Sequence, residues 1–373
     1  MIVPLLDLKA QHRTIKDEVV GRVMELAESQ LFILGKPVLE LEAQLAALSR
    51  APHAVGVSSG TDALLLPIRA LDPKPGDEVI TSPFTFFASA GTIHNAGAKP
   101  VFADIEPRTF NIDPAAVEAA ITPRTRAIMP VHLFGQMAAM ERLLPIARKH
   151  GIPLIEDAAQ SIGARRKVDG AWRMAGELGD ATGFSFFPSK NLGGWGDGGM
   201  VVATNQAIAD RVRRLRVHGG LQTYLHEEVG TNSRLDALQA AVLLAKLPHL
   251  AAWSAARRAN AARYDAALAG LGAVRTPATD PANEHIYNQY VIEAERRDEL
   301  QAYLKAHDVG TAVYYPLALH LQPCFRHLAY REGAFPVAEA ATRRVLALPV
   351  FPELTAAQQA HVTDTIRAFY GNS

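Results

Sequence analysis

The sequence has a single cysteine, Cys324, among its 373 residues. One cysteine cannot form a disulfide within the chain or a cysteine-based metal cluster, so we expect no metal and a reducing, cytoplasmic setting. Lysine plus arginine number 38, as do aspartate plus glutamate, so the formal net charge is zero. Without an excess of positive charge, we expect neither nucleic acid nor a membrane surface as a partner.

Long apolar runs are also missing from the sequence. No stretch approaches the roughly 18 apolar residues of a membrane-spanning helix. The first seven residues (MIVPLLD) turn acidic and lack a basic segment followed by a long apolar one, so we expect no signal peptide. Apolar residues nevertheless make up 49% of the chain, a composition that predicts a folded globular protein.

Seven short runs of β-branched and aromatic residues alternate with helical patterns in the first two thirds of the chain. These runs are Ala54–Val57, Glu78–Thr81, Pro100–Asp104, Ala127–His132, Pro153–Glu156, Thr182–Phe187 and Met200–Ala203. Strands that alternate with helices form mostly parallel, buried sheets. The sequence therefore predicts an α/β fold with a mostly parallel seven-stranded sheet.

The pattern changes near Pro248. Ser233–Leu247 has the pattern of a long helix that Pro248 ends, and Ala251–Ala269 that of a second helix. Further on we expect strands at Tyr287–Ile292 and Thr311–Tyr315, and helices at Arg296–His307, Val337–Leu346 and Thr355–Tyr370. We therefore predict an N-terminal arm and large domain in residues 1–248 and a smaller α+β C-terminal domain in residues 249–373.

Residues 58–62 (SSGTD) lie where a strand should end and a helix begin. Free backbone N–H groups and the positive end of the helix dipole meet at such a turn, which suits a phosphate. An ordinary turn with Thr61 as the helix N-cap explains the same residues, so this segment alone leaves both interpretations open.

Two ionisable residues follow buried strands. Asp157 ends one of them, and a buried carboxylate is costly unless it is paired. A pyridinium N–H would be a suitable partner, although an aspartate that caps a helix is the simpler alternative. Lys190 follows Thr182–Phe187. Most lysines are solvated surface groups, but a partly desolvated amine can attack a carbonyl carbon and form a Schiff base.

The glycine-rich residues 193–199 (GGWGDGG) contain the letters of a dinucleotide-binding fingerprint. That fingerprint must follow a strand and open a helix, whereas this stretch follows the Lys190 loop and leads into Met200–Ala203. We interpret these glycines as positions where the backbone passes close to a bound group.

Several of these segments, in their order along the chain, resemble a known family. The matching segments are residues 6–8 (LDL), 32–35 (FILG), 156–160 (EDAAQ), 189–193 (SKNLG), 232–236 (NSRLD) and 348–352 (LPVFP). Together they resemble the fold-type I, aspartate-aminotransferase-like pyridoxal-phosphate enzymes. Within that group they are most similar to the sugar aminotransferases of the DegT/DnrJ/EryC1/StrS family.

The resemblance implies a role for each matching residue around the cofactor ring. Lys190 would hold pyridoxal 5'-phosphate as a Schiff base, and Asp157 would pair with the ring nitrogen. Gln160 would approach the ring hydroxyl, and Phe86 would stack on the ring. Some relatives carry histidine in place of the lysine and are dehydratases, so Lys190 favours transamination.

The resemblance also implies contacts to the phosphate and the substrate. The phosphate would be held by Gly60, Thr61, Asp62 and Ser185 of one subunit and by Asn232 of the other subunit of a homodimer. The substrate would meet Arg234, Tyr314, Tyr315 and His320. Many relatives have His-Tyr-Pro where this chain has Tyr314-Tyr315-Pro316, so the sugar contact at Tyr314 departs from the family pattern. Taken one by one, His132, His218 and His320 are interpreted from the sequence as loop or packing residues and not as metal ligands, because no H-E-x-x-H or paired spacing occurs.

The activity implied by the resemblance is the transfer of an amino group from L-glutamate to a nucleotide-linked keto sugar, through the pyridoxamine form of the cofactor. The position aminated would be C3, of either a UDP-2-acetamido-3-keto-glucuronate or a dTDP-3-keto-6-deoxyhexose, the first being favoured. A non-catalytic regulatory protein that binds cofactor or sugar is the alternative from another class, and a β- or γ-lyase is a third possibility.

Overall fold

The structure is a computed structural model that describes residues 1–371. The α-helices are α1 (Leu8–Ser29), α2 (Lys36–Leu48), α3 (Gly60–Ala70), α4 (Ala88–Asn95), α5 (Pro114–Ala120), α6 (Met140–His150), α7 (Gln206–Leu215), α8 (Ala237–Lys246), α9 (Leu250–Leu268), α10 (Arg297–Ala306), α11 (Pro336–Arg344) and α12 (Ala356–Gly371). The strands are β1 (His53–Val57), β2 (Glu78–Thr81), β3 (Lys99–Phe102), β4 (Thr125–Met129), β5 (Ile155–Asp157), β6 (Arg165–Val168), β7 (Ala171–Met174), β8 (Ala181–Ser185), β9 (Gly199–Ala203), β10 (Val274–Arg275), β11 (Asn283–Glu284), β12 (Tyr290–Ala294) and β13 (Val345–Leu348). None of the helices within residues 1–371 has the length and apolar character needed to cross a membrane.

The predicted runs build one continuous sheet at the centre of the N-terminal part. A four-stranded sheet, β1-β9-β8-β5, meets a three-stranded sheet, β3-β2-β4, through parallel bridges from Ile128 to Leu154 and from Val131 to Asp157. Only β9 runs antiparallel to its neighbours, so the sheet is mostly parallel. The predicted α/β class is confirmed, and each of the seven runs coincides with a strand to within a few residues.

Glycine lets α3 lie close on this sheet. A Cβ at Gly183 of β8 would lie 2.8 Å from the carbonyl oxygen of Ala63, so any side chain there would push α3 away. Buried side chains of α3, such as Leu64 and Ile68, pack onto the same face as Val55 and Val201 of the sheet. The amino end of α3 is thereby fixed at the edge where β1 and β8 meet the loops that follow them.

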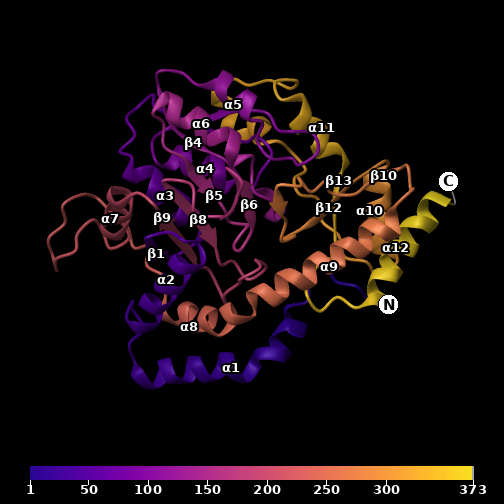
Figure 1. Cartoon of the computed structure of the whole chain (residues 1–373), viewed down its shortest axis with the longest axis horizontal. Coiled ribbons are helices and arrows are strands. Elements are labelled where there is room, and N and C mark those ends of the chain that lie inside the picture. Colours follow the sequence, from indigo (N-terminus) through magenta and orange to yellow (C-terminus); the bar gives the residue numbers. More distant parts are fainter. Residues whose placement is uncertain (372–373) are drawn as a thin grey trace.

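Helix α8 ends within one residue of the predicted Leu247 but differs from the prediction at its amino end. It begins at Ala237 instead of Ser233, because the backbone of Arg234 bridges to Val57 and that of Asp236 to Ile33. Pro248 does not separate α8 and α9 by a loop. It lies in the first turn of a 3-10 helix, Leu247–His249, where a missing N–H is tolerated, and α9 follows directly (Figure 1).

Two predictions near the C-terminus differ from the structure. The helix expected around Val337–Leu346 is confirmed as α11 but ends at Arg344, and Val345–Leu348 forms β13, which pairs antiparallel with β12. Thr311–Tyr315 is not a strand, since its backbone makes only an isolated bridge from Ala312 to Ala347. In both places pairing with a distant strand decides the structure, and local sequence patterns do not report it.

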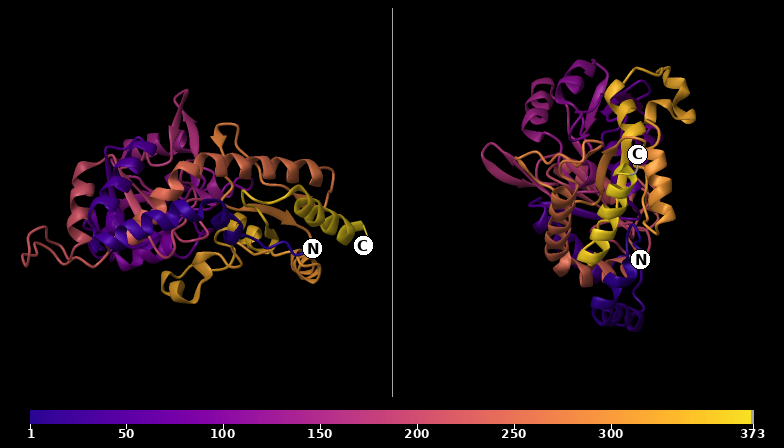
Figure 2. Two further views of the ribbon diagram at one scale, coloured as in Figure 1. Left: turned by 90° about the horizontal axis from the view of Figure 1, so that it is seen from below. Right: turned by 90° about the vertical axis from the view of Figure 1, so that its right-hand side faces the viewer.

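A second apolar core forms around β12 and β13. It joins Tyr264 of α9 and Ile366 of α12 to Val3 from the beginning of the chain. Helix α9 leads from α8 to this region (Figure 1), and α1 lies along α8 at the edge of the molecule. The segment after α7 projects from the body, as Figure 1 and the left view of Figure 2 show. A domain division near Pro248 stays a prediction.

Candidate active site

A cavity of about 410 Å³ lies where the parallel strands of the central sheet end. It is bounded by the amino end of α3, the loops after β2 and β4, the last residue of β5 and the loop after β8. Of the residues singled out in the sequence, those lining it are Gly60, Thr61, Phe86, Asp157, Gln160, Ser185, Lys190, Tyr314 and Tyr315. Residues more than 250 positions apart in the chain therefore meet in one place.

Asp157, the last residue of β5, has 5% of its surface exposed. Its Oδ2 accepts a hydrogen bond from Ser89 Oγ at 2.7 Å, and its Oδ1 accepts one from the Ala159 N–H at 3.2 Å. Burial raises the pKa of Asp157 above its ordinary value, and these hydrogen bonds and the charge of Lys190 offset this only in part. A cation bound against this carboxylate would relieve that cost.

Lys190 lies in the loop after β8 and is partly buried. Among residues 1–371 its amine has no hydrogen-bond or ion-pair partner. Burial lowers its pKa to about 8, although the charge of Asp157 acts in the opposite direction. The loop is tightly folded, since a Cβ at Gly193 would lie 2.3 Å from the Pro188 carbonyl oxygen. Lys190 is thus a free amine, more often unprotonated near neutral pH than a surface lysine.

The turn into α3 provides a cradle for an anion. Ser59, and not Thr61, is the N-cap, with its Oγ accepting from the Asp62 N–H at 3.1 Å. The first N–H groups of the helix have no partner within it and point out of its amino end. A Cβ at Gly60 would lie 2.5 Å from the Ser185 Cβ. Glycine is therefore what allows the Ser185 hydroxyl and these N–H groups to converge.

Gln160 is fixed between two partners. Its Oε1 accepts from the Phe134 N–H at 2.7 Å, and its Nε2 donates to the Tyr315 hydroxyl at 3.0 Å. Burial raises the pKa of Tyr315, so this hydroxyl stays protonated. One N–H of the Gln160 amide is left for a ligand in the cavity. Phe86 stands at the cavity with 59% of its surface exposed, a large apolar ring with room for a partner.

Four of the residues predicted for the site do not line this cavity. The Asp62 carboxylate is hydrogen-bonded to the Ser58 hydroxyl. His320 is buried, with its Nε2 3.0 Å from a carboxylate oxygen of Glu339. Asn232 is exposed, and within residues 1–371 the Arg234 guanidinium has no hydrogen-bond or ion-pair partner. Roles for these residues at the cofactor or substrate stay predictions.

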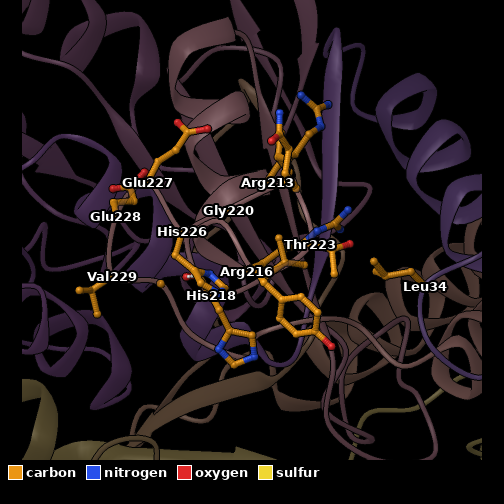
Figure 3. Close-up of a pocket in the computed structure, with 15 residues that line it drawn as sticks. Leu34, Arg213, Arg216, His218, Gly220, Thr223, His226, Glu227, Glu228 and Val229 are labelled. Atoms are coloured by element: carbon orange, nitrogen blue, oxygen red, sulfur yellow. Dashed lines mark hydrogen bonds between the residues drawn. The ribbon is translucent and has the colours of Figure 1, made fainter.

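A larger hollow of about 1080 Å³ opens beside the projecting segment after α7 (Figure 3). Charged groups at this hollow bind other protein groups: Arg216 contacts Glu42 at 2.6 Å, and Glu228 contacts Arg211 at 2.8 Å. The hollow lacks a free amine next to a buried carboxylate. We therefore place the chemistry in the smaller cavity.

The residues of the smaller cavity fit pyridoxal phosphate. The free Lys190 amine can bind its aldehyde, the anionic Asp157 can face a protonated ring nitrogen, and the Gly60 cradle suits its phosphate. Within residues 1–371 no group of three or more metal-ligating side chains is placed to hold a metal ion.

Sequence reasoning missed two groups around Asp157. Ser89 was recognisable only through its place in α4, which packs beside the end of β5. His132 was interpreted as a loop or packing residue, yet its Nε2 lies 2.6 Å from Glu156 Oε2.

The hairpin β6–β7 was also missed, although Asp169-Gly170 at its turn is a hairpin signal.

Solved structures of similar chains share this fold. One is the crystal structure of DesV from S. venezuelae in complex with a ketimine intermediate, with a TM-score of 0.95, 43% identity, and coverage of 99% of this chain and 98% of that one. Another is NtdA from Bacillus subtilis with bound cofactor PMP, with a TM-score of 0.90, 30% identity, and coverage of 98% and 85%. The predicted fold-type I architecture is confirmed.

Curated relatives cover almost the whole chain. A "pleiotropic regulatory protein" of Geobacillus stearothermophilus is 52% identical, with 99% of each chain covered. A UDP-N-acetyl-3-dehydro-alpha-D-glucosamine 3-aminotransferase of Acidithiobacillus ferrooxidans is 45% identical, with 98% of this chain and 97% of the relative covered. A UDP-2-acetamido-2-deoxy-3-oxo-D-glucuronate aminotransferase of Pseudomonas aeruginosa is 43% identical, with 95% and 97% covered.

The family model gives the same result over nearly the full length. The model of the DegT/DnrJ/EryC1/StrS aminotransferase family matches residues 13–367. The family expected from the sequence is therefore confirmed, and with it an aminotransferase that acts on sugar nucleotides. This chain belongs to the DegT/DnrJ/EryC1/StrS aminotransferase family.

Proposed function

We propose that this aminotransferase uses pyridoxal phosphate to move an amino group from L-glutamate to the keto carbon C3 of a UDP-linked 2-acetamido sugar. The observation that carries the proposal is the Lys190 amine, which has no hydrogen-bond or ion-pair partner within residues 1–371 and whose pKa burial lowers to about 8, in one cavity with the buried Asp157 carboxylate. This pair supplies a nucleophile and an anion at the places that amino transfer requires.

Bound pyridoxal phosphate supplies an electron sink as long as its ring nitrogen is protonated. Asp157 would hold that proton, because burial makes its carboxylate favour a bound cation. Lys190 would hold the cofactor through its Nζ. The same amine, when free, would serve as the general base for proton transfer, a role worth typically ~10²–10⁴-fold in rate.

Other residues of the cavity orient the cofactor. The N–H groups at Gly60 and Thr61 and the Ser185 hydroxyl would bind the phosphate, and Phe86 would cover one face of the ring. Gln160 would offer its remaining N–H to the ring hydroxyl, since its oxygen is already bound to the Phe134 N–H. Together these residues would fix the orientation of the ring.

The acceptor is proposed from the relatives and from the charges in the cavity. Relatives from A. ferrooxidans and P. aeruginosa are both named for UDP-linked 2-acetamido sugars with a keto group at C3. A carboxylate at C6, as in the glucuronate type, needs a cation, and Lys190 is the only lysine or arginine that lines the cavity within residues 1–371. The free guanidinium of Arg234, brought by the second subunit of a homodimer, fills that need.

The position of the segment before α8 supports a site shared between two subunits. Asn232 is exposed, and the Arg234 side chain has no hydrogen-bond or ion-pair partner within residues 1–371, yet their backbone is fixed against β1 and the end of α7. Rigid backbone that presents uncommitted polar side chains suits a contact with another chain across a two-fold axis. Asn232 would reach the phosphate and Arg234 the acidic groups of glutamate and sugar in the neighbouring cavity.

A regulatory role is the second candidate, because one relative is named a pleiotropic regulatory protein. A protein that only bound the cofactor would not need a base that moves protons. The combination of Lys190 and Asp157 in the cavity therefore supports catalysis.

The test is a screen of three acceptors with ¹⁵N-labelled glutamate and mass spectrometry of the sugar product. The acceptors are UDP-2-acetamido-3-keto-glucuronate, the corresponding 3-keto glucose, and dTDP-3-keto-6-deoxyhexose, with Lys190→Ala as the control. We expect labelled product from the glucuronate. Label only in the 3-keto glucose would contradict the C6 carboxylate, label only in the dTDP sugar would contradict the UDP assignment, and no label in any would favour the regulatory role.

A further inference from the structure

A second buried carboxylate lies next to Asp157 on β5. Glu156 has no exposed surface, and it accepts hydrogen bonds from the Gly179 N–H at 2.5 Å and the Gly176 N–H at 3.4 Å. Successive residues of a strand face opposite sides of the sheet, so Glu156 lies behind the strand end and outside the cavity that Asp157 lines. None of the steps described above uses this group.

His132 is the side-chain partner of Glu156. It too is fully buried, and its Nε2 lies 2.6 Å from Glu156 Oε2. Its Nδ1 accepts a hydrogen bond from the Ala138 N–H at 3.2 Å, so the ring proton must lie on Nε2, where it is donated to Glu156. A ring with one proton is neutral, and the pair therefore carries the full negative charge of Glu156.

Hydrogen bonds keep that charge on Glu156. Burial by itself raises the pKa of Glu156, and the hydrogen bonds that its carboxylate accepts from the His132 ring and from the backbone of Gly179 and Gly176 act in the opposite direction. The backbone around His132 also fixes Asp157. The backbone N–H of His132 donates to the Asp157 carbonyl, and the backbone N–H of Asp157 donates to the Pro130 carbonyl, both at 2.9 Å. The pair and the cavity carboxylate thus form one rigid unit.

We propose that Glu156, held as an anion by a neutral His132, is a positioning residue that acts through Asp157 to keep the ring nitrogen of the cofactor protonated. Two negative charges on neighbouring residues favour a cation at the cavity face more than Asp157 alone does. The inference rests on the proposed pyridoxal-phosphate site.

The test uses the enzyme with its cofactor and compares wild type with Glu156→Gln, a change that removes the charge and keeps the size. The absorbance of the lysine-bound cofactor is titrated with pH. Loss of an anion makes the protonated form of that chromophore less favourable, so the midpoint should fall by about half a unit to one unit. An unchanged midpoint overturns the proposal.

A matched control is available elsewhere in the fold. Glu339→Gln alters a carboxylate that is also buried, hydrogen-bonded to a histidine (His320) and bound by backbone N–H groups, but that lies outside the cavity. Its midpoint should equal that of wild type. An equal shift in both variants would mean that the loss of any buried carboxylate moves the midpoint, and it would overturn the specific role of Glu156.

Glu156→Gln would place an amide N–H against the His132 N–H and can therefore fail to fold, so a second measurement on the wild-type enzyme is needed. Nitrogen NMR of ¹⁵N-histidine-labelled protein reports which ring nitrogens carry protons, and His132→Gln identifies the signal. We expect one proton, on Nε2, at every pH of the titration. A doubly protonated His132 would neutralise Glu156 and overturn the proposal. A wild-type enzyme without a lysine-bound chromophore would instead contradict the proposed function.

Discussion

Replacing Gly60 by alanine tests the phosphate cradle. The added Cβ would lie 2.5 Å from the Ser185 Cβ, 2.7 Å from its Oγ and 3.1 Å from its Cα. Because Ser185 ends a buried strand and cannot simply rotate away, the amino end of α3 must move. Overpacking of this kind costs about 1–3 kcal/mol. If this free energy is lost from cofactor binding and not from folding, the affinity for pyridoxal phosphate falls about 5- to 150-fold.

The assay is a titration of apoprotein with pyridoxal phosphate, followed by absorbance, together with thermal unfolding of the apoprotein. Gly272→Ala is the matched control, since a Cβ there meets nothing within 4 Å. We expect weaker cofactor binding in Gly60→Ala alone. In the double variant Gly60→Ala with Ser185→Gly, the Ser185 side chain no longer meets the added Cβ. This variant should regain the position of α3, although it lacks the hydroxyl that would bind the phosphate. Unchanged affinity and unchanged unfolding in Gly60→Ala would refute the close approach of these two residues.

Three further predictions concern the chemistry and the assembly. Asp157→Asn keeps the shape of the side chain but not its charge, so kcat should fall about 100-fold or more while most cofactor binding is retained; wild-type turnover in this variant would contradict the role of Asp157. Because burial lowers the pKa of Lys190 to about 8, the rate at which apoprotein captures pyridoxal phosphate should rise with pH through about 8 and then level off, since the amine is then unprotonated. A rate that keeps rising up to the pH at which an ordinary lysine loses its proton would show that the amine is not desolvated. Lys190→Ala and Arg234→Ala, each with little or no activity alone, should complement each other when their subunits exchange. About half of the dimers then become hybrids with one intact site each, so activity should return to about a quarter of wild type. If hybrids form but activity does not recover, each chain builds its own site.

The central sheet could be predicted because its strands are buried on both faces. Glu78–Thr81 and Met200–Ala203 are short apolar runs bounded by turns, and such runs leave few alternatives to a strand. The direction of β9 could not be predicted, because a buried run reads the same whether its partner is parallel or antiparallel. Val345 and Leu346 were assigned to the end of a helix, because only pairing with β12 makes Val345–Leu348 a strand.

The cavity could be anticipated for a similar reason. Asp157 and Lys190 follow strands whose ends meet at one edge of the sheet, so their meeting follows from the topology. Partners that arrive from other elements could not be anticipated, since Ser89 and Tyr315 reach the site from a helix and from a loop far along the chain. The His132–Glu156 pair was hidden because it depends on how the loop after β4 turns back onto β5.

The measurement that tests the account most directly is the identity of the lysine that binds the cofactor. Holoenzyme is reduced with borohydride, which fixes the cofactor to its lysine, and is then digested and analysed by peptide mass spectrometry. We expect the modification on Lys190 alone and its loss, together with the absorption band, in Lys190→Ala. A modified peptide that carries another lysine, or an unchanged adduct in Lys190→Ala, would contradict the assignment of the active site.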